Sequence, residues 1–235
     1  MISFENISFS IAGRTLVKNS TVSIPNGHKV GLVGRNGTGK TSLFRLIYGE
    51  ITLDNGNLKL NKNVRVGGVS QEAPSSSITL IDTVLAADQE RTDLLEKAQI
   101  EKDPLKISEI QTRLTDIDAW SAEARASTIL NGLGFDKHKQ KLACSEFSGG
   151  WRMRVALAAV LFSKPELLLL DEPSNYLDLE GTIWLQSYIS QYPSTVIIIS
   201  HDRALLNSSV NSILHLEDKE LQLYTGNYET FAKTR

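Results

Sequence analysis

The sequence is poor in cysteine, in net charge and in long apolar runs, and each shortage argues against a class of protein. Cys144 is the only cysteine among 235 residues, so no disulfide can form within the chain and a reducing compartment is expected. The net charge of -2 argues against a general attraction to nucleic acid or anionic lipid. The longest apolar runs, such as 167–170 and 196–199, fall far short of the ~18 residues of a membrane span. The N-terminus lacks the basic start and apolar core of a signal peptide. We therefore expect a soluble, cytoplasmic protein without membrane insertion.

A glycine-rich loop carries the strongest chemical signal. Residues 34–41 read G-R-N-G-T-G-K-T, a complete phosphate-binding loop with an apolar strand pattern before it and an apolar helix pattern after it. Backbone N–H groups of such a loop wrap the phosphates, the lysine reaches the β- and γ-phosphates and the last hydroxyl binds Mg²⁺. A ligand-free glycine turn with this pattern arises by chance in about 1% of chains of this length. The predicted nucleotide-binding residues are Gly34, Arg35, Asn36, Gly37, Thr38, Gly39, Lys40, Thr41 and Ser42.

Around this loop the chain alternates between strand and helix patterns. Apolar residues alternate at 2–9 and 22–24, which predicts an antiparallel edge sheet, and 58–60 with 64–69 read as a further antiparallel pair. The continuous apolar runs 167–170 and 196–199, separated by helical patterns, indicate parallel strands buried on both faces. We therefore expect an α/β fold with a parallel core sheet and an antiparallel edge sheet.

A charged helical segment interrupts this pattern. Between about 86 and 124, apolar residues recur at helical spacing among many charges, and Asp103 followed by Pro104 predicts the start of the second of two antiparallel helices. We expect one domain over 1–235, with a helical subdomain at 76–160 and the insertion at about 86–124. Acidic residues outnumber basic ones in the insertion, which favours a basic protein partner over RNA phosphates. A plain solvated helix face is an equally good interpretation.

Two buried strands end in polar residues. Asp171 and Glu172 follow the run of leucines, at the carboxyl edge of a parallel strand where ligands bind. Asp171 is placed to hold Mg²⁺ and Glu172 to accept a proton from an attacking water, although a solvated strand end would look the same. His201 ends the second buried strand, where a histidine is more often structural than catalytic. Gln71 taken by itself would pass for a surface polar residue.

A second glycine pair precedes the helix that leads to Asp171. Ser148 can cap that helix, and the N–H groups of Gly149 and Gly150 form an anion site. One nucleotide does not need two such sites. The pattern makes sense if these residues cover the γ-phosphate held by another copy.

The order of these motifs resembles the nucleotide-binding domain of ATP-binding-cassette (ABC) proteins along essentially the whole chain. The resemblance implies a P-loop NTPase core that binds ATP and Mg²⁺ and hydrolyses ATP in a dimer. It also implies that Asp178 lies in a loop crossing the dimer interface. The implied catalytic residues are Glu172, His201 and Gln71, the implied metal ligands are Thr41, Gln71 and Asp171, and the implied residues for the partner's nucleotide are Ser148, Gly149 and Gly150.

Three features resemble the F subgroup of this family. They are Trp151 after the glycine pair, the loop 173–181 and the C-terminal Y-T-G-N-Y-E-T-F at 224–231. ABC-F proteins act on ribosomes and carry two cassettes per chain, of which this sequence resembles the first. The resemblance implies a second cassette as partner, in the same chain or as a homodimer, and the ribosome as target. Ile11 departs from the family, which often places an aromatic residue there against adenine.

Two other functions would also use a nucleotide-binding domain. Single-cassette length suits the ATP-binding subunit of a membrane transporter, whereas Trp151, the loop 175–178 and the charged insertion argue against that interpretation. A non-hydrolysing nucleotide sensor is disfavoured because Glu172 and His201 are both present.

Overall fold

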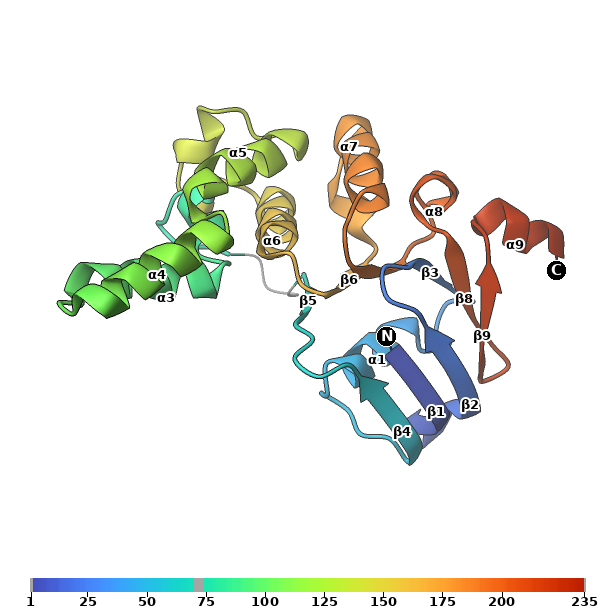
Figure 1. The fold of residues 1–235 in the computed structure, drawn as a ribbon. Helices are drawn as coiled ribbons and strands as arrows, with labels where there is room; N and C mark the ends of the chain where they lie inside the picture. Colours follow the sequence, from blue (N-terminus) through green and yellow to red (C-terminus); the bar gives the residue numbers. More distant parts are fainter. Residues whose placement is uncertain (1, 70–73, 235) are drawn as a thin grey trace. The chain divides into compact units, whose positions relative to one another are not determined.

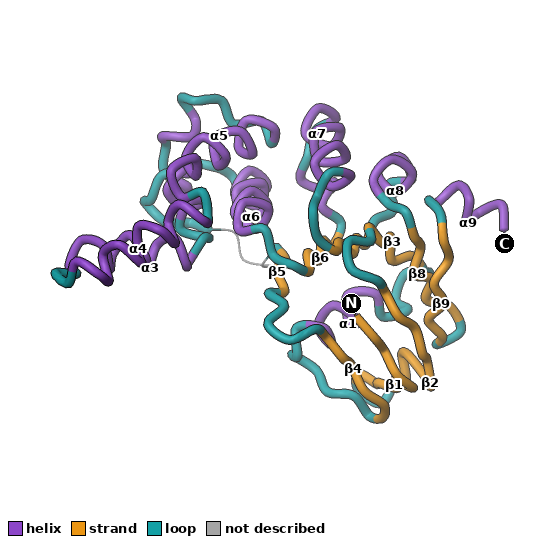
Figure 2. The backbone as a smooth tube through the Cα atoms, in the orientation of Figure 1, coloured by secondary structure: helices purple, strands orange, loops and turns teal. Residues whose placement is uncertain are grey.

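The computed structural model describes residues 2–69 and 74–234 (Figure 1). The chain forms two units, one made of Met1–Gly68 with Pro165–Arg235 and the other of Val69–Lys164. Among the described residues the first unit contains all the strands, and the second is helical (Figure 2). No helix of the described part of the chain is long and apolar enough to cross a membrane.

A hairpin opens the first unit. Strands β1 (Ile2–Ile11) and β2 (Arg14–Ile24) pair antiparallel, and β4 (Asn55–Leu60) adds to the free edge of β1. The two turn residues, Ala12 and Gly13, both have positive φ, at 49° and 78°. Positive φ at both positions is the type I′ geometry that matches the twist of a two-residue hairpin. The antiparallel edge sheet expected from the alternation is confirmed.

The second sheet of this unit is mostly parallel. Its order is β5 (Val66–Gly68), β6 (Leu167–Asp171), β7 (Thr195–Ile199), β3 (Lys29–Val33), β8 (Ser212–Glu217) and β9 (Glu220–Thr225). All neighbours in this order run parallel except β8 and β9, which form a hairpin. The apolar runs at 167–170 and 196–199 form buried parallel strands, as predicted, and the structure places these two strands, β6 and β7, side by side. Their carboxyl ends therefore lie beside each other, next to the end of β3.

The predicted pairing of 58–60 with 64–69 is wrong. Leu58 and Leu60 belong to β4, which pairs with β1, whereas Val66 starts β5, which pairs with β6 in the other sheet. The alternation identifies both segments as strands, but it carries no information about partners. The leucines of β4 pack against the core of the edge sheet, and β5 completes the parallel ladder instead.

One hydrophobic core joins both sheets of the first unit to α1 (Lys40–Ile47). Phe4 and Phe9 of β1 are fully buried with Leu43 and Phe44 of α1, in a cluster that also contains Leu32 of β3. The remaining helices of this unit are α7 (Leu179–Ser190), α8 (Arg203–Ser209) and α9 (Tyr228–Thr234), with a 3-10 turn at Pro173–Tyr176. Because α1 is part of this core, the end of the loop that precedes α1 is fixed relative to both sheets.

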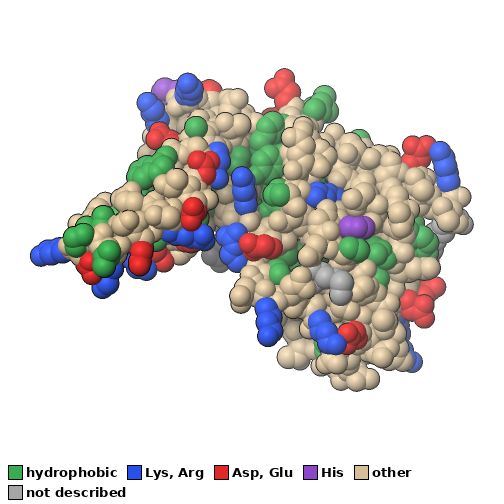
Figure 3. Space-filling model, in the orientation of Figure 1, with side chains coloured by type: hydrophobic (Ala, Val, Ile, Leu, Met, Phe, Trp, Pro, Cys, Tyr) green, Lys and Arg blue, Asp and Glu red, His purple; other side chains and the backbone are tan. Residues whose placement is uncertain are grey.

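The second unit is built around α6 (Gly149–Ser163). Helices α2 (Leu80–Leu85) and α5 (Ala122–Gly132) pack against it, and 3-10 turns lie at Ala119–Ser121, Lys139–Lys141 and Cys144–Glu146. Helices α3 (Gln89–Ile100) and α4 (Pro104–Asp116) pack against each other, and Asp103 caps α4 as expected, accepting from the Leu105 N–H at 3.0 Å. Basic, acidic and apolar side chains mix on the surface of this pair (Figure 3).

Candidate functional site

The phosphate-binding loop links β3 to α1. Its glycines take conformations and approaches that other residues cannot: Gly39 has φ +109°, and a Cβ at Gly34 would lie 2.4 Å from the Leu216 carbonyl oxygen of β8. The Thr38 hydroxyl donates to the Arg35 carbonyl at 2.9 Å and closes the loop from inside. The loop is therefore held by β8 on one side and by α1 at its end.

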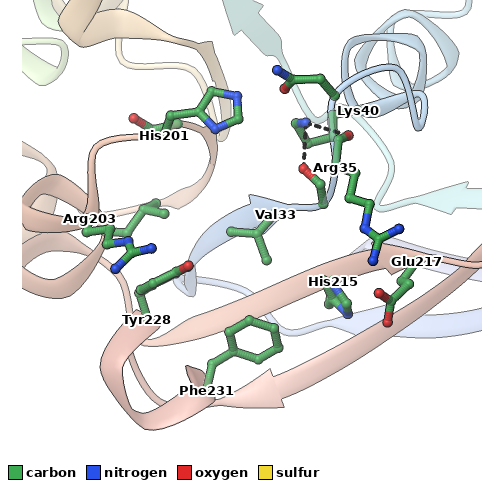
Figure 4. A pocket seen from close by; sticks show the side chains of 13 residues that line it. Val33, Arg35, Lys40, His201, Arg203, His215, Glu217, Tyr228 and Phe231 are labelled. Atoms are coloured by element: carbon green, nitrogen blue, oxygen red, sulfur yellow. Dashed lines mark hydrogen bonds between the residues drawn. The ribbon is translucent and has the colours of Figure 1, made fainter. Parts of the chain in front are cut away.

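Lys40 begins α1 and turns back over the loop. Its ammonium donates to the carbonyls of Gly34 at 2.8 Å and Arg35 at 3.1 Å, drawn as dashed lines in Figure 4. The residue is 9% exposed, and burial lowers the pKa of its ammonium, an effect opposed by the carboxylates of Glu172 and Asp171. An ammonium held at the loop in this way can exchange its carbonyl partners for phosphate oxygens.

Thr41 and Asp171 meet across the site. The Thr41 hydroxyl donates to Asp171 Oδ2 at 2.7 Å, so the first turn of α1 contacts the carboxyl end of β6. Both groups offer oxygen ligands, which suit Mg²⁺. The two residues lie far apart in sequence, and only the parallel ordering of β6, β7 and β3 brings them together.

Glu172 lies in an unusual backbone conformation beside His201. With φ 47° and ψ 53° it is left-handed, a strained state for a non-glycine residue and one that occurs at active sites. Its Oε2 accepts from the His201 N–H at 3.3 Å, and Oε1 is 3.5 Å from His201 Nε2. That second contact lacks hydrogen-bond geometry, which leaves Oε1 buried without a hydrogen-bond partner among the described groups. A buried carboxylate oxygen in this state can accept a hydrogen bond from a water molecule.

These side chains line one cavity of about 510 Å³. This volume lies within the range of small-molecule sites. The loop glycines, Lys40, Thr41 and Ser42 form one wall, and Asp171, Glu172 and His201 form another. Ile11, Arg14 and Leu16 of the hairpin complete it. Of these three, the sequence drew attention to Ile11 alone. Arg14 was missed, and only its place beside the hairpin turn could have indicated it.

A neighbouring cavity of about 500 Å³ shares Asn36, Lys40 and His201 with the first. Figure 4 shows Arg35 and Arg203 on opposite sides of it, with Tyr228 and Phe231 of α9 below. The Arg203 guanidinium lies 5.5 Å from the centre of the Tyr228 ring. Residues of α9 and of the phosphate-binding loop therefore line the same cavity.

The glycine pair of the second unit is open. Ser148 occupies the N-cap position of α6, but its hydroxyl makes no capping hydrogen bond, so the predicted side-chain cap is wrong. A Cβ added at Gly149 or at Gly150 would meet no atom within 4 Å. Packing within the chain therefore does not require glycine here, and the helix start has room for an approaching group.

Trp151 fixes the start of this helix. The Arg154 guanidinium lies 4.3 Å from the ring centre and the Lys139 ammonium 5.2 Å, and the Phe135 ring meets Trp151 edge-on at 5.2 Å. Aromatic and cation–π contacts of this kind stabilise by about 0.5–1.5 kcal/mol each. The tryptophan thus has a packing role that its place after the glycine pair did not reveal.

Of the three predicted Mg²⁺ ligands, Thr41, Gln71 and Asp171, the structure describes Thr41 and Asp171. Gln71, predicted to contact Mg²⁺ and the attacking water, lies outside the described residues. Within residues 2–69 and 74–234, no three His, Cys, Asp or Glu side chains gather to hold a metal ion. Thr41 and Asp171 form a partial donor set that phosphate oxygens could complete, since Mg²⁺ is often bound by one or two protein oxygens together with substrate phosphates.

Comparison with known proteins agrees with this geometry. The ABC transporter family model matches residues 17–175. The probable ATP-binding protein YheS of Haemophilus influenzae is 42% identical over 238 residues, which cover all of this chain and 37% of that protein. Human ATP-binding cassette sub-family F member 3 is 40% identical over 245 residues, with 100% and 34% covered. The chain thus spans about a third of the length of these relatives.

Solved structures share the fold at low identity. The ATP-binding subunit of an ABC transporter has a TM-score of 0.73 at 14% identity, with 100% of this chain and 92% of that chain covered. A dimeric ATP-binding cassette in a post-hydrolysis state, bound to ADP and Pi, has a TM-score of 0.66 at 18% identity, with 96% and 98% covered. Together with the phosphate-binding loop and the Thr41–Asp171 contact, these findings show that the chain belongs to the ATP-binding-cassette family of ATPases, among the proteins of its F subfamily.

Proposed function

We propose that this chain binds ATP with Mg²⁺ and hydrolyses it at a site completed by a second cassette. The observation that carries the proposal is the convergence of Lys40, Thr41, Asp171 and Glu172 on one cavity of about 510 Å³. In this proposal the loop N–H groups and Lys40 bind the phosphates, and the two units act as one ATP-binding domain. Residues 76–160 are its helical subdomain, which includes the insertion at about 86–124.

The oxygen donors of the site fit Mg²⁺. Thr41 and Asp171 would hold the ion together with Gln71, and the ion would neutralise charge that develops on the phosphates. The Thr41–Asp171 contact supports this assignment, because hydroxyl and carboxylate oxygens are ligands of the hard cation and are already within 2.7 Å of each other.

Glu172 is the proposed general base. Its buried Oε1 has no hydrogen-bond partner among the described groups, so it can accept a hydrogen bond and then a proton from the attacking water. The His201 backbone holds the other oxygen, and the His201 ring, 63% exposed at its side chain, is free to contact the γ-phosphate. Gln71 would orient the water.

The open glycine pair supports a shared site. We infer that Ser148, Gly149 and Gly150 of one cassette cover the γ-phosphate bound by its partner, because these helix-start N–H groups form an anion site that this chain's own nucleotide does not need. The partner is a second cassette, in the same chain or as a homodimer. Its absence would leave ATP bound and hydrolysis slow.

The cellular role we infer is regulation of translation at the ribosome, in the cytoplasm. The supporting observation is the identity of about 40% to sub-family F members. The alternative is the ATP-binding subunit of a membrane transporter, which the fold neighbours favour by their names alone. Sedimentation of the tagged protein with ribosomes in the presence of ATP supports the first, and sedimentation with membranes supports the second.

Glu172→Gln tests the catalytic proposal. Glutamine keeps the size and hydrogen bonding of the side chain but cannot take a proton, so the variant should bind ATP, lose turnover and accumulate as an ATP-bound dimer in gel filtration. Glu96→Gln, which changes an exposed carboxylate on α3, is the matched control and should hydrolyse ATP at the wild-type rate. Wild-type turnover by Glu172→Gln would remove this residue from the proposed role.

A further inference from the structure

The β1–β2 hairpin forms a wall of the nucleotide cavity that contains no aromatic ring. Its type I′ turn places Ile11 and Arg14 directly opposite each other in the strand register. Both line the cavity together with Leu16, and no other residue of the hairpin does. This wall consists of the guanidinium of Arg14 and the aliphatic side chains of Ile11 and Leu16. Arg14 is exposed, and Leu16 is buried.

This wall is fixed relative to the phosphate-binding loop. A Cβ on Gly39 would lie 3.1 Å from the side chain of Leu16, so the hairpin packs directly against the loop just before Lys40. A nucleotide whose phosphates occupy the loop therefore has its base within reach of the hairpin. Asp171, which bonds Thr41, and Glu172, whose charge acts on Lys40, line the phosphate end of the same cavity.

We propose that Arg14 recognises the base of the bound nucleotide, with Ile11 and Leu16 against it, and that the site accepts guanine as well as adenine. The proposal rests on the nucleotide site proposed above and adds how that site selects its substrate.

The chemistry of the hairpin wall explains why adenine and guanine would both be accepted. A guanidinium is planar and stacks on ring faces, and every base offers such a face. It also only donates hydrogen bonds, which suits N7 of either purine and O6 of guanine, whereas the 6-amino group of adenine needs an acceptor. None of the three side chains of the hairpin wall is an acceptor. Large discrimination between related ligands requires a buried polar partner that the wrong ligand leaves unpaired, and these side chains supply none.

Calorimetry with Mg²⁺ and ATP, GTP or inorganic tripolyphosphate tests the proposal on the 235-residue chain. The wild type should bind ATP and GTP with affinities within about tenfold of each other. Arg14→Ala should weaken both nucleotides by about tenfold, because base stacking is lost, and should leave tripolyphosphate binding unchanged. Lys18→Ala removes an exposed cation from the same strand, away from the cavity, and should change none of the three.

The planar geometry of the guanidinium is tested separately. Arg14→Lys keeps the charge but not the plane, so it should weaken both nucleotides nearly as much as Arg14→Ala does. Equal weakening of tripolyphosphate and the nucleotides by Arg14→Ala would overturn the proposal, since Arg14 would then act through its charge alone. Binding of GTP more than about a hundredfold weaker than ATP would also overturn it. If the wild type binds none of the three ligands, the proposed nucleotide site fails first and this inference fails with it.

Discussion

The Thr41 hydroxyl donates a 2.7 Å hydrogen bond to Asp171, which lies 130 residues further along the chain. The contact joins the first turn of α1 to the carboxyl end of β6. It places the hydroxyl of the phosphate-binding loop and the acidic strand end in one site. The loop and the strand end can therefore act on the same nucleotide.

Lys40→Ala should weaken ATP binding strongly. The ammonium now bonds two loop carbonyls and is the only lysine lining the cavity among the described residues, so its loss removes a charge-assisted contact to the phosphates. Isothermal titration with Mg-ATP measures the effect, and a drop of about tenfold or more is expected. An unchanged affinity would mean that the phosphates bind elsewhere.

Ser148→Arg should separate binding from turnover. A bulky cation at the open start of α6 leaves the chain's own phosphate loop untouched but blocks the approach of a second cassette. ATP affinity should stay at the wild-type value. The wild-type ATPase rate per molecule should rise with protein concentration if the active species is the proposed dimer, whereas the variant's rate should stay low and flat. A wild-type rate independent of concentration, with no dimer under ATP, would contradict the shared site.

Mixing Ser148→Arg with Lys40→Ala sharpens this test. Each mixed dimer keeps one intact site, built from Lys40 of the first variant and Ser148 of the second. Recovery of activity in the mixture, above the sum of the two variants alone, is expected if one site suffices for turnover.

Trp151→Ala should destabilise the helical unit by about 2–4 kcal/mol, because the variant loses the contacts with Arg154, Lys139 and Phe135. Urea unfolding followed by circular dichroism measures the change in unfolding free energy. Trp120→Ala is the matched control, since Trp120 belongs to the same unit and is 65% exposed. The control should change stability by less than about 0.5 kcal/mol. Equal effects of the two substitutions would deny Trp151 this packing role.

The raised pKa of Tyr48 predicts that the folded protein loses stability in alkaline solution. Burial, together with the charges of Glu50 and Asp171, raises the pKa of Tyr48 to about 12 from its ordinary value of 10.0. The folded state thus favours the neutral phenol. The stability that this provides is complete below pH 10.0 and is lost as the pH rises toward 12, where the unfolded chain is ionised first.

Thermal unfolding between pH 10 and 12 tests whether this loss of stability occurs. The melting temperature of Tyr48→Phe should fall less between pH 10 and 12 than that of the wild type, each compared with its own value at neutral pH. Tyr176→Phe is the matched control, because the two tyrosines are similarly exposed overall, at 41% and 39%, whereas the hydroxyl of Tyr48 lies against Gly68 of β5. Identical curves for Tyr48→Phe and the wild type would show that Tyr48 does not contribute.

Local patterns in the sequence identified several elements correctly. Asp103 with Pro104 marked the start of α4, because capping and the fixed φ of proline act within one turn. The apolar runs at 167–170 and 196–199 marked β6 and β7, since strands buried on both faces need apolar side chains throughout. The turn at Ala12 and Gly13 and the left-handed Glu172 were not identified, because neither alanine nor glutamate signals a positive φ.

What the sequence by itself determined was therefore the chemistry: a loop of glycines, lysine and threonine, an acidic strand end, and a glycine pair before a helix. Each depends on residues that are neighbours in the chain. The tertiary structure alone decided which strands pair, that Thr41 reaches Asp171, and that Arg14 forms a wall of the same cavity. The physical reason is that strand pairing and burial are set by contacts between distant segments. The alternation that predicts strands at 58–60 and 64–69 is the same whichever partner these segments take.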